Sequence, residues 1–110
     1  MTDHFTVFQL KQDIAAGRVK SRDITQSFLD RIQRYDAAIG AYLSVFADKA
    51  LQQAQAVDKK IAAGQPVGSL AGIPIAIKDN LCYTEGLTTC GSKILSNFKP
   101  PYNAHVVEQL

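Results

Sequence analysis

Lys78 ends a short alternating apolar segment, and its amine is a candidate base. Isoleucines at positions 73, 75 and 77 alternate with Pro74, Ala76 and Lys78. This period-two pattern of β-branched residues predicts a strand, with Lys78 on the face opposite the isoleucines. Because burial disfavours an ammonium, a lysine held in a cleft can accept a proton from a hydroxyl group. A lysine at a strand end also commonly extends into water in a structural role. The pattern alone favours the structural role, because structural lysines greatly outnumber catalytic ones.

Polar residues that follow the lysine are candidates to support it from a second layer: Asp79, Asn80, Thr88, Thr89 and Ser92. Aspartate and asparagine commonly tie down turns, so we favour a structural role for the first two. The three hydroxyl residues have an equally good explanation as turn and cap residues. The sequence therefore predicts a polar surrounding for Lys78 without choosing between support and plain structure.

Other chemistries fit this chain poorly. Ile75–Lys78 looks like the lysine strand of a protein kinase, but no correctly spaced glycine loop precedes it. No phosphate-binding Gly-x-x-x-x-Gly-Lys motif is present either. We expect Cys82 and Cys90 to be reduced thiols. Because a zinc site needs about four clustered ligands, and His4 and His105 stand far apart in sequence, we expect no metal site in this chain. We also expect no cofactor-binding residue in it.

Three amphipathic helices are predicted before the lysine segment. Thr6 and Gln9 have the spacing of a capping box, and Gly17 stands where a helix would end. Ser21 can cap a second helix, with Asp23 in its first turn. A third helix should end near Gly64 and Pro66. The expected apolar faces are Phe5, Phe8, Leu10 and Ile14; then Ile24, Phe28, Leu29, Ile32, Tyr35 and Ile39; then Ala47, Ala50, Leu51, Ala54, Val57 and Ile61.

The texture changes near residue 67, which suggests two regions. We predict an N-terminal helical region at residues 1–66 and the start of an α/β core at residues 67–110. The strand that ends at Lys78 should enter a mixed central sheet, and Asn103 should cap a last helix that begins an apolar face at Val106. The predicted fold class is therefore α/β.

Charge and hydropathy exclude some classes of protein. The formal net charge is +2, and the basic residues are scattered among acids, so no nucleic-acid-binding patch is predicted. No apolar run approaches the roughly 18 residues that span a bilayer. The first residues, Met1–Phe5, lack the pattern of a signal peptide. We therefore expect a cytoplasmic protein with no membrane partner.

The lysine segment resembles that of the amidase signature family. The resemblance continues through Thr88–Leu95 and Phe98–Ala104, and the helical lead-in around Ser21–Ile24 also fits. It therefore covers nearly the whole chain and implies the N-terminal part of the amidase fold. The residues that carry it most specifically are Leu70-Ala71-Gly72-Ile73-Pro74-Ile75-Ala76-Ile77-Lys78-Asp79-Asn80-Leu81-Cys82.

This resemblance implies amide hydrolysis by a Ser–cis-Ser–Lys triad. The lysine matched by Lys78 would take a proton from a middle serine, which would deprotonate the nucleophilic serine. That nucleophile would attack the side-chain amide of glutamine, forming an acyl-enzyme and releasing ammonia, and water would complete the hydrolysis.

Within the family, the chain is most similar to the A subunits of glutamyl-tRNA(Gln) amidotransferases. That similarity implies a heterotrimer with subunits B and C, and glutamine as the ammonia donor. Misacylated tRNA would bind mainly through the B subunit, which would use ATP and magnesium to activate it. The ammonia would then convert Glu-tRNA(Gln) to Gln-tRNA(Gln).

The sequence departs from the family pattern in one respect: the Gly/Ser-rich stretch that carries both serines is absent. None of Ser44, Ser69, Ser92 or Ser96 lies in such a stretch. Removing members of a comparable triad costs on the order of a millionfold in rate, so we expect these 110 residues alone to be inactive. Two alternatives stay open, a stand-alone amidase of the same family and a non-catalytic helical interaction module.

Overall fold

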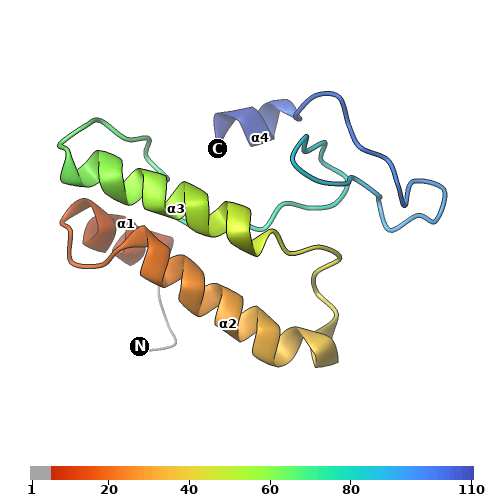
Figure 1. Ribbon diagram of the computed structural model, residues 1–110, viewed down its shortest axis with the longest axis horizontal. Coiled ribbons are helices and arrows are strands. Elements are labelled where there is room, and N and C mark those ends of the chain that lie inside the picture. Colours follow the sequence, from red (N-terminus) through yellow and green to blue (C-terminus); the bar gives the residue numbers. More distant parts are fainter. Residues whose placement is uncertain (1–5) are drawn as a thin grey trace. The chain divides into compact units, whose positions relative to one another are not determined.

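The computed structural model describes residues 6–110, so the expectations for His4 and Phe5 lie outside its range. Contacts divide the chain into two compact units. One contains the chain up to Ala41 with Phe46–Pro74, and the other contains Tyr42–Val45 with Ile75–Leu110. The helices, in chain order, are α1 (Val7–Ala15), α2 (Ser21–Ile39), α3 (Ala47–Ala62) and α4 (His105–Gln109) (Figure 1).

Helix α1 begins at the predicted capping box, and α1 and α3 end at the predicted glycines. The capping box is formed, since the Gln9 N–H donates to Thr6 Oγ1 at 3.2 Å and the Thr6 N–H donates to Gln9 Oε1 at 3.3 Å. Glycine caps close both helices with paired backbone hydrogen bonds. The N–H groups of Gly17 and Gly64 donate to the carbonyls of Ile14 and Ile61, each at 3.0 Å. These are local signals, and each was sufficient to place a helix end.

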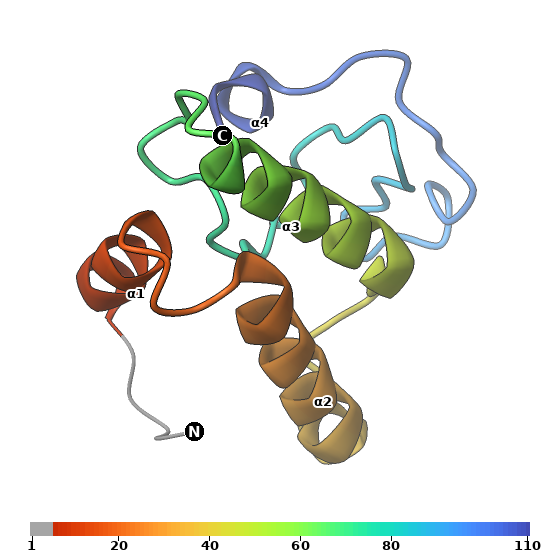
Figure 2. The same cartoon turned by 60° about the vertical axis from the view of Figure 1, so that its left-hand side comes forward.

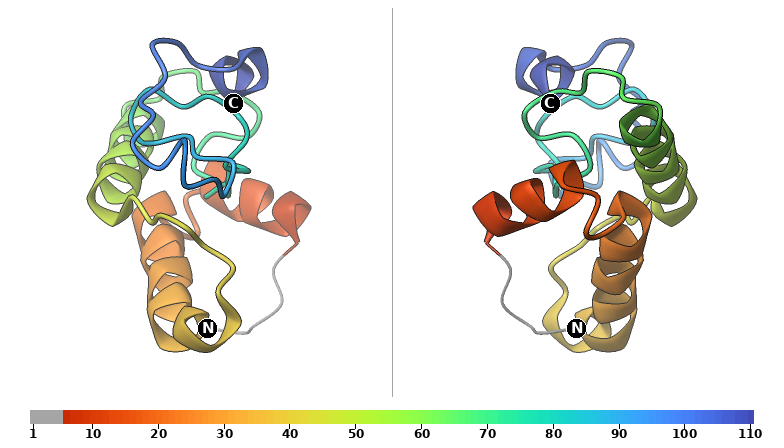
Figure 3. Two further views of the ribbon diagram at one scale, coloured as in Figure 1. Left: turned by 90° about the vertical axis from the view of Figure 1, so that its right-hand side faces the viewer. Right: turned by 90° about the vertical axis from the view of Figure 1, so that its left-hand side faces the viewer.

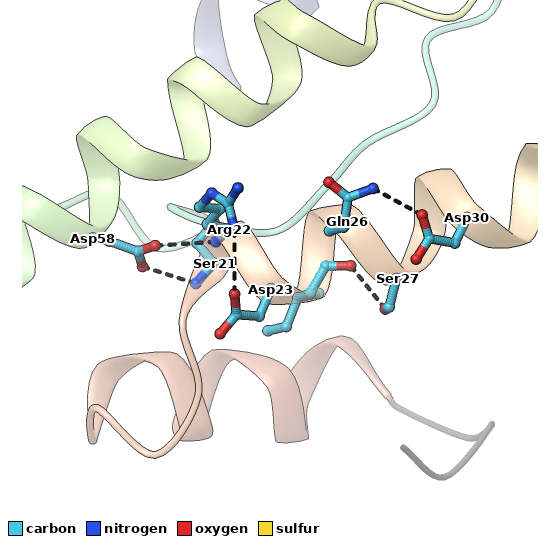
Figure 4. A network of polar contacts seen from close by, with 8 residues as sticks. Ser21, Arg22, Asp23, Gln26, Ser27, Asp30 and Asp58 are labelled. Atoms are coloured by element: carbon cyan, nitrogen blue, oxygen red, sulfur yellow. Dashed lines mark hydrogen bonds and ion pairs between the residues drawn. The ribbon is translucent and has the colours of Figure 1, made fainter.

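Helix α2 begins at Ser21, but the prediction that Ser21 caps it is wrong. Its first amides are satisfied instead by Asp58 from α3. The Ser21 N–H donates to Asp58 Oδ1 at 2.8 Å, and the Arg22 N–H donates to Asp58 Oδ2 at 3.0 Å (Figure 4). The Ser21 hydroxyl donates to the Gly72 carbonyl at 2.8 Å. Asp23 lies in the first turn as predicted. The half-buried Asp58 carboxylate thus caps α2 from another helix.

Replacing Asp58 with alanine should lower the free energy of unfolding of the intact protein by about 1–2 kcal/mol, because both amide donors lose their acceptor. Thermal and denaturant unfolding would measure this change. Gln55→Ala is the matched control, since Gln55 is exposed on the same helix and should cost less than about 0.5 kcal/mol. Equal stability of the two variants would contradict the capping role of Asp58.

The core of the first unit lies where α1 meets the N-terminal part of α2. Leu10, Ile14 and Ile24 are buried there, and Val19, Ile61 and Ile73 pack against them. Helix α3 returns alongside α2 in the opposite direction (Figures 1 and 2). Ala54 in α3 is also buried, whereas Ile39 at the end of α2 is 70% exposed.

The apolar face predicted for α2 is therefore buried only near its start within this chain. Ile24 is 1% exposed, whereas Phe28 and Tyr35 are 40% and 46% exposed. Arg31 and Arg34 lie over the Tyr35 ring, 5.9 and 5.2 Å from its centroid.

Within residues 6–110, every helix is too short or too polar to cross a membrane.

The strand predicted at residues 73–78 is not formed, so the described residues give no support to the mixed sheet that it was expected to enter. No described residue between α3 and α4 forms a strand, and the tube in Figure 3 is irregular there. A strand exists only when its backbone pairs with a second strand, and no segment of residues 6–110 supplies one. The Ile73 N–H instead closes a turn to the Leu70 carbonyl at 3.1 Å. Of the three alternating isoleucines, Ile73 packs on the core, whereas Ile75 and Ile77 are 45% and 37% exposed.

The second unit consists of linked turns followed by the short helix α4. The prediction that Asn103 caps this helix is wrong, because the cap position is Ala104 and has no side-chain acceptor. Asn103 Oδ1 instead accepts the N–H and hydroxyl of Thr84 at 2.8 and 3.1 Å. The Ala104 N–H donates to the Cys82 carbonyl at 2.8 Å. Asn103 therefore joins two distant parts of the loop region.

Candidate active site around Lys78

Lys78 is exposed in this chain, at the end of the alternating segment of residues 73–78. The cleft burial considered for it from the sequence is not found among the described residues. Its amine forms no ion pair within residues 6–110. Its carbonyl accepts the Leu81 N–H at 3.0 Å, so the backbone turns directly after it. The side chain is thus open to solvent, while the backbone that carries it is held.

Asp79, the residue after the lysine, is bound tightly to Thr89. The Thr89 N–H donates to Asp79 Oδ2 at 3.1 Å, and the Thr89 hydroxyl donates to the same oxygen. The Cys90 N–H donates to the Asp79 carbonyl at 2.9 Å. Thr89 Oγ1 also accepts the Gly91 N–H at 3.2 Å. Two of the predicted supporting residues are therefore brought together immediately beside Lys78.

Thr88 is the buried polar residue of this region, at 4% exposure. Its hydroxyl donates to the Leu81 carbonyl at 3.4 Å and accepts the Tyr83 N–H at 3.3 Å. Its own N–H donates to the Phe98 carbonyl at 3.1 Å. Thr88 therefore joins three stretches of loop, and its hydroxyl is engaged with the backbone on both sides.

The remaining two candidates contribute less to the surroundings of Lys78. Asn80 is exposed, and Ser92 is half-buried. The Ser92 N–H donates to the Thr89 carbonyl at 2.8 Å and closes the turn after Thr89. In the part of the chain that the structure describes, neither side chain donates or accepts a hydrogen bond, so neither is joined to Lys78 or Asp79.

The contribution of Cys90 was not predicted from the sequence. Its φ is +51°, in the left-handed region that residues other than glycine seldom adopt, and Gly91 follows at +65°. This conformation accompanies the hydrogen bond from the Cys90 N–H to Asp79. The adjacent glycine was the one available signal of a tight turn, and it does not identify the partner.

The chain belongs to the amidase family, whose model matches residues 23–110. It is 49% identical, over 96% of its length, to the A subunit of glutamyl-tRNA(Gln) amidotransferase from Protochlamydia amoebophila. It is 52% identical, over the same share, to the A subunit of that name numbered 2 in Clostridium acetobutylicum. The chain spans 22% of the length of each of these relatives.

A solved structure has the same fold over most of this chain. The match has a TM-score of 0.82 and 31% sequence identity, and covers 91% of this chain and 22% of the other. That structure was reported as "An unexpected vestigial protein complex reveals the evolutionary origins of an s-triazine catabolic enzyme". The arrangement of helices and loops described above is therefore one found in a larger protein.

Proposed function

We propose that the protein acts as the A subunit of a glutamyl-tRNA(Gln) amidotransferase, with Lys78 as the base in glutamine hydrolysis. The observation that carries this proposal is the place of Lys78 in the chain. It stands in the segment typical of the family, on a backbone held by the hydrogen bonds of Leu81 and Asp79. Relatives with that name are about half identical to this chain over 96% of its length, which supports the choice within the family.

In the proposed mechanism, the Lys78 amine accepts a proton from a middle serine, which in turn activates a nucleophilic serine. Attack on the glutamine amide then forms an acyl-enzyme, and the amide nitrogen takes the proton back from Lys78 through the middle serine and leaves as ammonia. Water hydrolyses the acyl-enzyme to glutamate and restores the serine. Both serines would come from a Gly/Ser-rich stretch that these 110 residues do not contain. Because a lysine in water keeps its proton, the mechanism also requires other parts of the intact protein to cover Lys78.

The ammonia would be used by the partners of this chain, subunits B and C. The B subunit would bind the misacylated tRNA and activate it with ATP and magnesium, and the C subunit would complete the complex. The described part of the chain contributes the base to this scheme. In this scheme the hydrolysis of glutamine uses neither ATP nor a metal ion, since a serine deprotonated with the help of Lys78 is the nucleophile that attacks the amide.

A second candidate is a stand-alone amidase that acts on another amide. The match of the amidase family model to residues 23–110 supports it, since that family name specifies no particular amide. Both functions would use Lys78 in the same way. They differ in the substrate and in the need for partner subunits.

Purification of the intact, tagged protein from its own cells would distinguish the two candidates. We expect it to bring down a second, tRNA-binding subunit, and to release ammonia from glutamine. With ATP, the complex should convert Glu-tRNA(Gln) to Gln-tRNA(Gln). An active amidase that never binds such a partner would contradict our first proposal and support the second. A protein with no amidase activity would contradict both.

A further inference from the structure

The orientation of Lys78 depends on its backbone rather than on its side chain. Within residues 6–110 its amine has no ion-pair partner. The Asp79 carboxylate is adjacent in sequence, but it accepts its hydrogen bonds from Thr89 instead of pairing with the amine. The peptide groups beside Lys78 therefore set the position and direction of its Cα–Cβ bond, from which the amine extends.

Those peptide groups are held by Leu81 and by the turn at residues 89–92. The carbonyls of Lys78 and Asp79 accept the N–H groups of Leu81 and Cys90 at 3.0 and 2.9 Å. The Asp79 side chain adds two hydrogen bonds from Thr89. Consecutive peptide groups on the C-terminal side of Lys78 are thus anchored, and most of the anchoring passes through Asp79 and Thr89.

The Thr89 hydroxyl links this anchor to the rest of its turn. It donates to Asp79 and also accepts the Gly91 N–H at 3.2 Å. The Ser92 N–H then donates to the Thr89 carbonyl at 2.8 Å. Removing this hydroxyl would therefore leave the Asp79 carboxylate with only the Thr89 N–H, and would take away the acceptor of the Gly91 N–H.

We propose that Asp79 and Thr89 form a positioning pair that aims the Lys78 amine, an inference that rests on the proposed role of Lys78 as base. Neither residue exchanges a proton with the substrate. A reacting group displaced by about 1 Å can lose on the order of a hundredfold in rate. A catalytic group therefore depends on neighbouring residues whose own positions are fixed by hydrogen bonds. The pair should therefore act on the rate of the chemical step and leave glutamine binding almost unchanged.

The test compares variants of the intact protein in glutamine hydrolysis, with Tm recorded for each. Thr89→Val and Asp79→Ala should each lower kcat by about tenfold to a hundredfold, with KM within about twofold. Thr89→Ser keeps the hydroxyl and should restore most of kcat. Because the two residues act through one contact, the double variant should be little worse than either single variant.

Thr84→Val is the matched control. It removes a hydroxyl of the same unit, one that donates to Asn103 at 3.1 Å and has no contact with Asp79. We expect it to lower Tm by a similar amount to Thr89→Val and to leave kcat unchanged.

Two results would overturn the positioning role. One is a Thr89→Val enzyme with the kcat of Thr84→Val, and the other is additive losses in the double variant. Lys78→Ala, assayed in parallel, separates this inference from the proposed function. If Lys78→Ala is inactive and Thr89→Val is normal, only the positioning role fails. If Lys78→Ala stays active, both fail.

Discussion

Gly72→Ala should destabilise the intact protein by about 2–4 kcal/mol, one of the largest effects we expect from a single methyl group. Gly72 has a φ of +83°, which costs an L-residue roughly 1–2 kcal/mol. A Cβ there would also lie 3.0 Å from both Cβ and Oγ of Ser21, and 3.4 Å from Cδ1 of Ile14. The first two distances are well inside ordinary carbon contacts, and such overpacking costs about 1–3 kcal/mol.

Ser21 cannot easily move away from the added methyl group. Its hydroxyl donates to the Gly72 carbonyl and its N–H donates to Asp58, each at 2.8 Å. Any shift would break these bonds at the start of α2 and disturb Ile14 and Ile24 in the core. The strain should therefore appear as lost stability, measured as a lower Tm and a lower denaturant midpoint.

Gly68→Ala is the matched control, four residues earlier in the same loop. A Cβ at Gly68 meets nothing within 4 Å. The same substitution should be neutral or stabilising by up to about 1 kcal/mol, since it reduces the freedom of the unfolded chain. If Gly72→Ala matched Gly68→Ala in stability, the close packing of Gly72 on α2 would be refuted.

The features that could be predicted from the sequence are those whose cause is local. A capping box joins residues three apart, and a glycine cap closes the turn beside it. The residue types at Thr6, Gln9 and Gly17 were therefore enough to predict both ends of α1. The start of α2 was different. Ser21 has the correct residue type for a cap, but Asp58 lies 37 residues later and satisfies the amides instead. No periodic pattern reports a contact of that kind.

The lysine segment shows the same limit for β-structure. Its alternation predicted a strand, but a strand also needs a second segment to pair with. Among the described residues no such segment exists, so Ile73–Lys78 remains unpaired. Helix-forming stretches do not have this problem, because their backbone hydrogen bonds are internal.

The sequence named five polar residues as candidates around Lys78 but did not predict how they connect, and the side chains of Asn80 and Ser92 form no hydrogen bond within residues 6–110. Asp79, Thr88 and Thr89 were selected as polar neighbours of Lys78, and all three are engaged in hydrogen bonds of the same unit. That Asp79 would bind Thr89, rather than pair with Lys78, depends on how the loop between them closes. The left-handed turn at Cys90 provides that closure, and nothing in the residue type of Cys90 predicts it.

Lys78→Ala in the intact protein should lower kcat for glutamine hydrolysis by at least about ten-thousandfold, and by as much as a millionfold. Losses of this size follow removal of a member of a catalytic triad. Tm should be recorded beside kcat, so that loss of the base is told apart from loss of folding. A steady-state ammonia assay with thermal unfolding of the same samples would measure both quantities.

Lys78→Arg separates a base from a positive charge. Arginine keeps the charge and most of the reach of lysine, but its guanidinium stays protonated and cannot accept a proton. We therefore expect this variant to be as inactive as Lys78→Ala. Lys93→Ala is the matched control, since Lys93 is an exposed lysine in the same unit and should keep full activity. Recovery of activity in Lys78→Arg would mean that Lys78 serves as a charge, and the proton-accepting role would have to be given up.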